Sequence, residues 1–201
     1  MGYDEKIFKA KANIKARRLW LVFAILLTAN YGTDTANGAY SVSNYIIFVI
    51  LCWLPFVCGD ILLKKKGKDN DRYRLAFVIG YGIFYVFLLC TTTSPIAFTY
   101  ILPIISLIVI FKDEKFMIYC AVANMLSLIA SIAFHIFVLG QNTAIDHKNF
   151  QLQIACLLLC YIGYIMSVRH LTESDAALTE SIKSDLNRVV TTVEQVKTAS
   201  N

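Results

Sequence analysis

The sequence has few charged residues and few prolines for its length. Of its 201 residues, 16% are charged, 57% are apolar and three are proline. Soluble domains contain about 25% charged and about 45–50% apolar residues. This composition excludes an ordinary soluble domain. Because the apolar residues form long runs between short charged stretches, it predicts a membrane protein.

Motifs for catalysis, metal binding and nucleic-acid binding are also lacking. The sequence contains no HExxH, no Gly-rich phosphate loop and no CxxC pair. All six cysteines lie within apolar runs, where a thiol behaves as a small hydrophobic group: Cys52, Cys58, Cys90, Cys120, Cys156 and Cys160. The formal charge of +5 comes from Lys and Arg at the ends of the apolar runs, where lipid headgroups lie. We therefore expect no enzyme activity, no metal, no cofactor and no nucleic-acid partner, with the lipid bilayer as the main partner.

Six apolar runs are each long enough to cross a bilayer. They cover residues 19–34, 42–63, 75–90, 96–111, 116–139 and 152–168. The sequence thus predicts an all-α, polytopic membrane protein with six transmembrane helices. Three parts are expected: a basic N-terminus at 1–18, a six-span sensor domain at 19–168, and a cytoplasmic coiled-coil helix at 169–201.

The N-terminal residues 3–18 are basic and have an apolar helical face of Tyr3, Ile7, Ala10 and Ile14. This pattern predicts a short amphipathic helix on the cytoplasmic leaflet. A frayed basic tail is one alternative. A cleaved signal peptide ending near Ala36 or Gly38 is another, although the Asn and Tyr residues that close the apolar run favour retention.

The distribution of Lys and Arg predicts the orientation. Of 19 such residues, only Lys148 lies in a loop that falls on the opposite side from the rest. By the positive-inside rule, both termini are cytoplasmic. We expect a multi-pass protein of the bacterial inner (plasma) membrane.

Polar residues within the spans are the candidate ligand site, because lipid offers them no hydrogen-bond partner. They fall in the outer half of the spans or share a helix face with residues there: Asn30, Asp34, Asn37, Asn44, Tyr81, Tyr85, Asn124, Ser131 and His135. One hypothesis is an outward-facing pocket for a small molecule. The alternative, which is common in membrane bundles, is that these residues hydrogen-bond between helices.

The last 40 or so residues form the second notable feature. After Arg169 and His170 the sequence is polar and charged, with neither Gly nor Pro, so one helix can continue from the sixth span into water. An apolar seam follows in steps of 4, 3, 4 and 3: Ile182, Leu186, Val189, Val193 and Val196. This is the a/d spacing of a coiled coil. The expected partner is a second copy of the chain, in a dimer or a larger bundle.

Residues 184–200, SDLNRVVTTVEQVKTAS, resemble the first cytoplasmic helix of a bacterial methyl-accepting chemotaxis protein. Methylation sites in that family are Glu or Gln pairs flanked by small residues. Here Glu194 and Gln195 form such a pair between Thr191 and Thr198, whereas Val190 departs from the pattern. The resemblance implies that Glu194 and Gln195 are modified, which would change the charge and packing of the helix.

The chain also departs from that family. It has no large extracellular domain between the first two spans, no HAMP linker before the seam and no signalling hairpin. A chemotaxis adaptor and a histidine kinase are therefore expected partners only if a signalling domain follows.

These features predict a transmembrane chemoreceptor that sends a membrane or outer-face signal through the sixth span. One alternative is the substrate-binding subunit of a vitamin-type transporter. Another is the membrane part of a sensor kinase or cyclic-dinucleotide enzyme.

Overall fold

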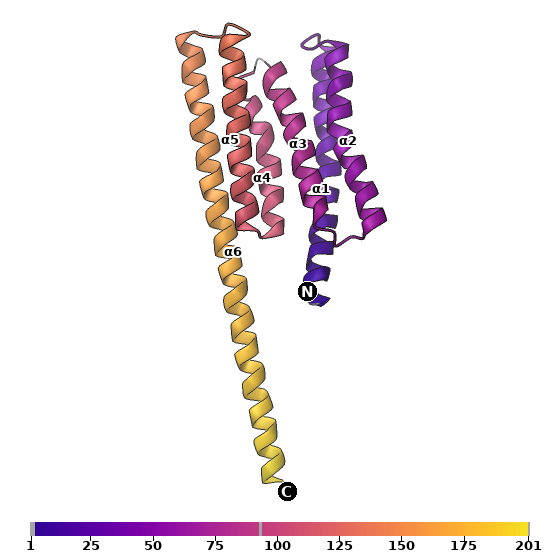
Figure 1. Cartoon of the computed structure of the whole chain (residues 1–201), viewed down its shortest axis with the longest axis vertical. Coiled ribbons are helices and arrows are strands. Elements are labelled where there is room, and N and C mark those ends of the chain that lie inside the picture. Colours follow the sequence, from indigo (N-terminus) through magenta and orange to yellow (C-terminus); the bar gives the residue numbers. More distant parts are fainter. Residues whose placement is uncertain (1–2, 93, 201) are drawn as a thin grey trace.

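The computed structural model describes residues 3–92 and 94–200, and these residues form helices and loops with no strand. The α-helices are α1 (Tyr3–Ala36), α2 (Val42–Lys66), α3 (Arg72–Thr91), α4 (Leu102–Ile108), α5 (Glu114–Phe137) and α6 (Ala144–Ala199). Two 3-10 helices, η1 (Ala97–Ile101) and η2 (Val109–Phe111), flank α4. Figure 1 shows a bundle from which the C-terminal part of α6 projects alone. The predicted all-α fold is confirmed.

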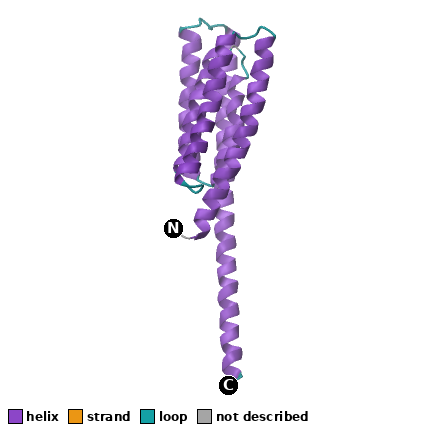
Figure 2. Cartoon of the chain, turned by 90° about the vertical axis from the view of Figure 1, so that its right-hand side faces the viewer, coloured by secondary structure: helices purple, strands orange, loops and turns teal. Residues whose placement is uncertain are grey.

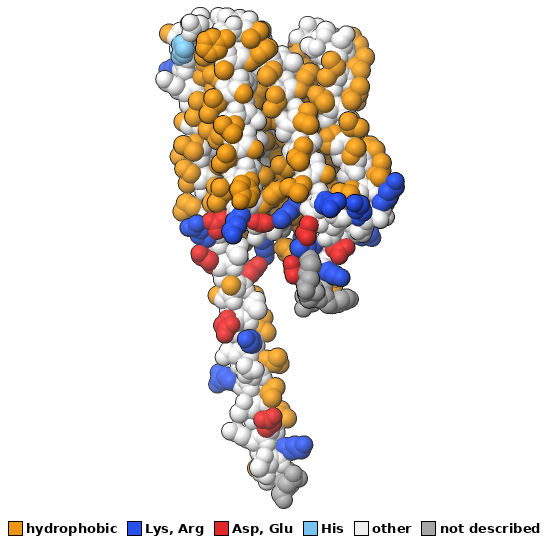
Figure 3. Space-filling model, viewed as in Figure 1, with side chains coloured by type: hydrophobic (Ala, Val, Ile, Leu, Met, Phe, Trp, Pro, Cys, Tyr) orange, Lys and Arg blue, Asp and Glu red, His pale blue; other side chains and the backbone are white. Residues whose placement is uncertain are grey.

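The outer surface of the bundle is apolar. The helices α2, α3, α5 and α6 are long and apolar enough to cross a membrane, and Ala97–Phe111 is a shorter apolar segment. Figure 3 shows that the apolar surface ends at a belt of Lys, Arg, Asp and Glu side chains where α6 leaves the bundle. An apolar band bordered by charge matches a bilayer core and its headgroups. These features are those of a membrane protein.

The helices pack mainly against their neighbours in sequence. α2 lies against α1 and α3, and α5 lies against α3 and α6. Figure 2 shows the connecting loops at the two ends of the bundle, with the N-terminus at the end where α6 leaves. Aromatic side chains fill the centre: Trp20 of α1 packs edge-on against Phe77 and Tyr81 of α3, with ring centroids 5.2 Å apart in each pair. Aromatic pairs of this geometry fix α1 against α3.

The helices α2 and α3 approach closely where Pro55 faces Gly80. Pro55 lies inside α2, which continues past it to Lys66. A Cβ atom added to Gly80 would lie 2.3 Å from the Cβ atom of Pro55, far inside van der Waals contact. The absence of a side chain at Gly80 therefore makes room for the proline ring.

α1 continues through residue 18 without a break, which differs from the predicted surface helix at 3–18. We call the end of the bundle where α6 leaves the inner end, and the opposite end the outer end. The segment 3–18 is the part of α1 at the inner end, and its buried residues are Ala12, Asn13 and Ala16. Ile7, Ala10 and Ile14 are only half-buried. The physical reason is tertiary packing. The buried face of this segment contacts the loop between α2 and α3, and this contact cannot be inferred from the apolar pattern of the segment itself.

The predicted fourth span, 96–111, is interrupted by changes of helix type. Pro103 lies in the first turn of α4, where its missing N–H leaves no intrahelical bond unmade. The 3-10 turns before and after α4 lengthen the segment, because they rise more per residue than an α-helix.

α6 is one continuous helix of 56 residues, about 84 Å long. The prediction that the last span and the tail form one helix is confirmed. The helix begins at Ala144, earlier than the predicted residue 152, because Thr143 and Asp146 form a capping box. The Thr143 hydroxyl accepts from the Asp146 N–H at 3.2 Å, and the Asp146 carboxylate accepts from the Thr143 N–H at 2.9 Å.

Candidate functional site

The short turn between η2 and α5 connects three parts of the inner end of the bundle. Its residues Lys112 and Asp113 and the first residue of α5, Glu114, each form an ion pair. Asp113 pairs with α3, whereas Lys112 and Glu114 both pair with α6. Lys112 pairs with Asp175 of α6. Lys112 also has left-handed backbone angles, φ 50° and ψ 38°, which are uncommon for a residue with a side chain. This conformation ends η2 and lets the chain turn into α5.

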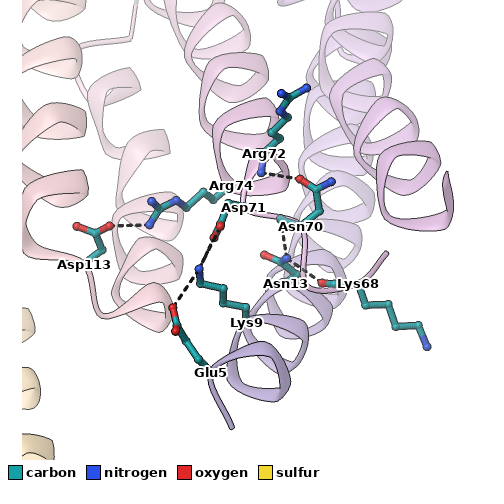
Figure 4. A network of polar contacts seen from close by, with 9 residues as sticks. All are labelled: Glu5, Lys9, Asn13, Lys68, Asn70, Asp71, Arg72, Arg74 and Asp113. Atoms are coloured by element: carbon teal, nitrogen blue, oxygen red, sulfur yellow. Dashed lines mark hydrogen bonds and ion pairs between the residues drawn. The ribbon is translucent and has the colours of Figure 1, made fainter. Parts of the chain in front are cut away.

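Asp113 joins α5 to α3. Its carboxylate accepts from the Phe116 N–H at 2.9 Å, which caps α5, and lies 2.6 Å from Nη1 of Arg74. Figure 4 shows Arg74 reaching from α3 towards Asp113. The Arg74 guanidinium also lies over the Phe116 ring, 4.8 Å from its centroid. Burial raises the pKa of Asp113, but the Phe116 N–H and Arg74 outweigh it, so its pKa lies below the usual value.

Glu114 holds the exit helix at the boundary between bundle and tail. Its Oε1 accepts from Nε and Nη2 of Arg169 at 3.0 and 2.5 Å. The hydrogen bond to Glu114 raises the pKa of Arg169 further above its already high value. Together with the pair between Lys112 and Asp175, this contact fixes α6 to the turn just where α6 leaves the bundle.

The inner part of α1 is fixed to the loop between α2 and α3. Figure 4 shows the buried Asn13 amide donating to the carbonyl oxygens of Lys68 and Asn70, at 2.9 and 3.1 Å. Lys9 pairs with Asp71, and the hydrogen bond to that carboxylate raises the pKa of Lys9. Satisfied polar contacts of this kind fix the position of α1 at the inner end.

These groups surround a cavity of about 670 Å³ at the inner end of the bundle. The lining comes from α1, α3, the turn at 111–115 and α6, which contributes Thr172. Acidic and basic side chains are equally represented: Glu5, Asp71, Asp113 and Glu114 against Lys9, Arg74, Lys112 and Lys115. A change in this cavity would act on the bundle and on the exit helix together.

The predicted ligand residues fall into separate groups. Ser131 and His135 line a cavity of about 80 Å³ at the outer end of α5. The buried His135 donates from Nε2 to the Leu89 carbonyl at 2.7 Å, and its Nδ1 lies 2.9 Å from Oε1 of Gln141. Thr92 lines the same cavity with a buried hydroxyl that has no hydrogen-bond partner among residues 3–92 and 94–200.

The other predicted residues lie outside that cavity. Asn124 donates to the Tyr161 hydroxyl and joins α5 to α6. Tyr81 and Tyr85 donate to carbonyl oxygens of Tyr100 and Phe98 in η1, the second at 3.1 Å. In these three residues the polar side chains hydrogen-bond to other helices, as expected from the alternative to a ligand pocket.

The last group is at the outer ends of α1 and α2. The Asn30 amide donates to the Tyr100 hydroxyl at 3.4 Å. Asn37 is exposed, Asp34 and Asn44 are half-exposed, and the Asn44 backbone N–H is bonded by the cap residue Ser41. The nine residues therefore do not share the one cavity that Ser131 and His135 line.

The tail presents its predicted seam to the surroundings. All five seam residues, from Ile182 to Val196, are 58–62% exposed. Glu194 and Gln195 are exposed and lie on a different side of the helix from the seam. Of the residues that the structure describes, no group of three or more His, Cys, Asp or Glu is placed to hold a metal ion.

Comparisons of the chain with protein families, with curated proteins and with solved structures find no match.

Sequence reasoning missed the role of the turn at 112–114 and of Asn13. The turn shows in sequence only as four charges of mixed sign, which any inner turn can carry. Asn13 had one available signal, since it is an amide within a basic helix and has an alanine three residues away on either side, Ala10 and Ala16.

Proposed function

We propose that this chain is a multi-pass receptor of the bacterial inner membrane, of the methyl-accepting chemotaxis type. It has six spans: α1 from residue 19 onward, α2, α3, the η1–α4–η2 segment, α5, and the first part of α6. Both termini are cytoplasmic. An even number of spans agrees with the charge distribution and with the N-terminus and the tail lying at the same end of the bundle (Figure 1).

The observation that carries the proposal is the construction of α6. A single helix packs inside the bundle at Leu157, Tyr161 and Val168 and then projects beyond it with an exposed apolar seam. Without a hinge, a shift or rotation in the membrane reaches the tail directly.

A path for the signal follows from the contacts. At the outer end, His135 holds α5 to α3 through Leu89. Asn124 and Tyr161 join α5 to α6 at mid-depth, and Glu114 and Arg169 join them at the inner end. A stimulus that favours one arrangement of α3 and α5 would move α6 through these bonds. Charge changes at Glu194 and Gln195 would tune the output.

The experiment measures whether the outer end controls the tail. Spin labels at Lys11→Cys and Ser184→Cys, in a chain with the native cysteines replaced, report the distance between α1 and the tail. We expect His135→Ala to change the distance distribution. Phe137→Ala is the matched control, because this side chain is two residues away on the same helix and 84% exposed. Identical distributions for His135→Ala and the unmodified chain would contradict the proposal.

A further inference from the structure

The apolar seam of the tail lies on the same face of α6 that packs against the bundle. Tyr161 and Val168 are buried in the bundle, and Asp175, Ile182 and Val189 follow at intervals of seven residues. Residues seven apart on an α-helix differ in direction by only about 20°. Ile182 therefore points within about 40° of the direction of Val168.

The contacts at the exit point show the same direction. Asp175, one heptad before Ile182, pairs with Lys112 at the base of the bundle, and Thr172 lines the inner cavity. Figure 3 shows the apolar side chains of the tail on the side that lies beneath the bundle. The seam thus faces the space directly below the protein's own membrane part.

This direction conflicts with pairing between two copies of the chain. Two helices that pack through a seam have axes about 8–10 Å apart. On that face of α6, within the bundle, the space is filled by α4, η2 and α5 of the same chain. A second copy joined in parallel through the seam would extend its own α6 upward into that space. Its bundle, which lies on its seam side too, would overlap the first bundle in the same membrane.

We infer that the seam binds an amphipathic α-helix of a cytoplasmic partner, which ends below the bundle, rather than a second copy of the chain. The edges of the seam define the chemistry of this helix. Lys183 and Lys197 border one edge, together with the half-exposed Val190, and Asp185 borders the other. A fitting helix has an apolar stripe with acidic residues opposite the two lysines.

The inference goes beyond the proposed receptor function and does not depend on the stimulus. It requires only that the bundle lies in a membrane and that α6 is continuous. Pairing between copies of the chain would overturn this inference but would not contradict the receptor proposal. Conversely, an unchanged distance between α1 and the tail in His135→Ala would contradict the receptor proposal but not this inference.

Disulfide cross-linking in proteoliposomes tests the inference with the full chain, after replacement of the native cysteines. The probe is a peptide of residues 171–201 that carries Val189→Cys and has no bundle attached. We expect the peptide to form disulfides with full chains carrying V189C or V193C several-fold more than with chains carrying S184C. Ser184 is the matched control, since it is exposed on the opposite face of the same helix. Disulfides between full chains should not exceed the level of the S184C control.

Two results would overturn the inference. The first is efficient disulfide formation between full chains at V189C and V193C. The second is peptide capture no greater at the seam than at S184C. A further variant identifies the surface: Val193→Glu places a charge in the seam and should abolish peptide capture by V189C. Undiminished capture in this variant would place the contact elsewhere and also overturn the inference.

Discussion

At the scale of single residues, the bundle depends on positions where size or backbone shape leaves little choice. Gly80 is such a position, because the ring of Pro55 fills the space where a side chain would begin. Lys112 is another, because its left-handed backbone redirects the chain between two helices while its ammonium group reaches Asp175. Both residues act at junctions between helices.

The change Gly80→Ala should destabilise the protein by about 1–3 kcal/mol, because the new methyl group overlaps Pro55 and must push α2 away from α3. Thermal unfolding in detergent measures the effect. Gly82→Ala is the matched control on the same helix, since a Cβ atom there has no other atom within 4 Å. Helix propensity alone would favour alanine at both positions, so equal stabilities of the two variants would refute the close contact.

At the scale of the elements, Asp113 has two tasks. It caps α5 through the Phe116 N–H and pairs with Arg74 of α3, so one carboxylate starts one helix and holds another. Asn at the same position would keep the cap, because asparagine is also a good N-cap residue, but it would lose the charge. The two tasks can therefore be separated.

We expect Asp113→Asn to lower the free energy of unfolding by about 1 kcal/mol at neutral pH, the order of one partly exposed charged hydrogen bond. The folded-state pKa of Asp113 is lowered, so its contribution is present above the unfolded pKa and is lost as pH falls through the folded value. The difference between the variant and the unmodified protein should shrink below about pH 4.

Unfolding curves at several pH values measure this difference. Asp185→Asn is the control, because Asp185 makes no ion pair within the described part of the chain and should show no comparable dependence. A difference that persists unchanged at low pH would mean that the charge of Asp113 has no role.

The elements themselves were largely predictable from sequence, since long apolar runs predict helices at 42–63, 75–90 and 116–139. The start of α6 was missed because the capping box at Thr143 uses Asp146 in place of the usual Glu or Gln. The ion pairs formed by residues 112–114 could not be predicted from the sequence. The partners of Lys112, Asp113 and Glu114 lie 63, 39 and 55 residues away in sequence, and only the packed bundle brings them together.

The candidate ligand residues show the same limit. Spacing and loop position in the sequence predict an outer position for Asn30, Asp34, Asn37, Asn44 and His135. The grouping of the candidate residues did not follow from the sequence, because it depends on which faces of α1, α3 and α5 meet. His135 and Ser131 share a cavity, whereas Asn30 bonds to Tyr100 outside that cavity.

At the scale of the whole molecule, the charged belt and the positions of the two chain termini lead to a testable membrane topology, with both termini in the cytoplasm. A membrane-impermeant maleimide applied to intact cells should label Lys148→Cys at the outer loop and should not label Lys68→Cys or Lys197→Cys. The latter two should react only after the membrane is opened, because the positive-inside rule predicts that the side with the other Lys and Arg residues is cytoplasmic. Labelling of Lys197→Cys in intact cells would rule out a cytoplasmic tail.

The length of α6 has a mechanical consequence. Beyond Val168 the helix continues for about 30 residues, a stiff arm of roughly 45 Å. If the bundle acts as the fulcrum, a tilt of 5° would displace the far end on the order of 4 Å, close to the rise of three residues along a helix. The ion pairs of Glu114 and Lys112 clamp the arm next to that fulcrum. Under the proposed function, small rearrangements inside the membrane would be amplified into displacements large enough to separate or join packed side chains.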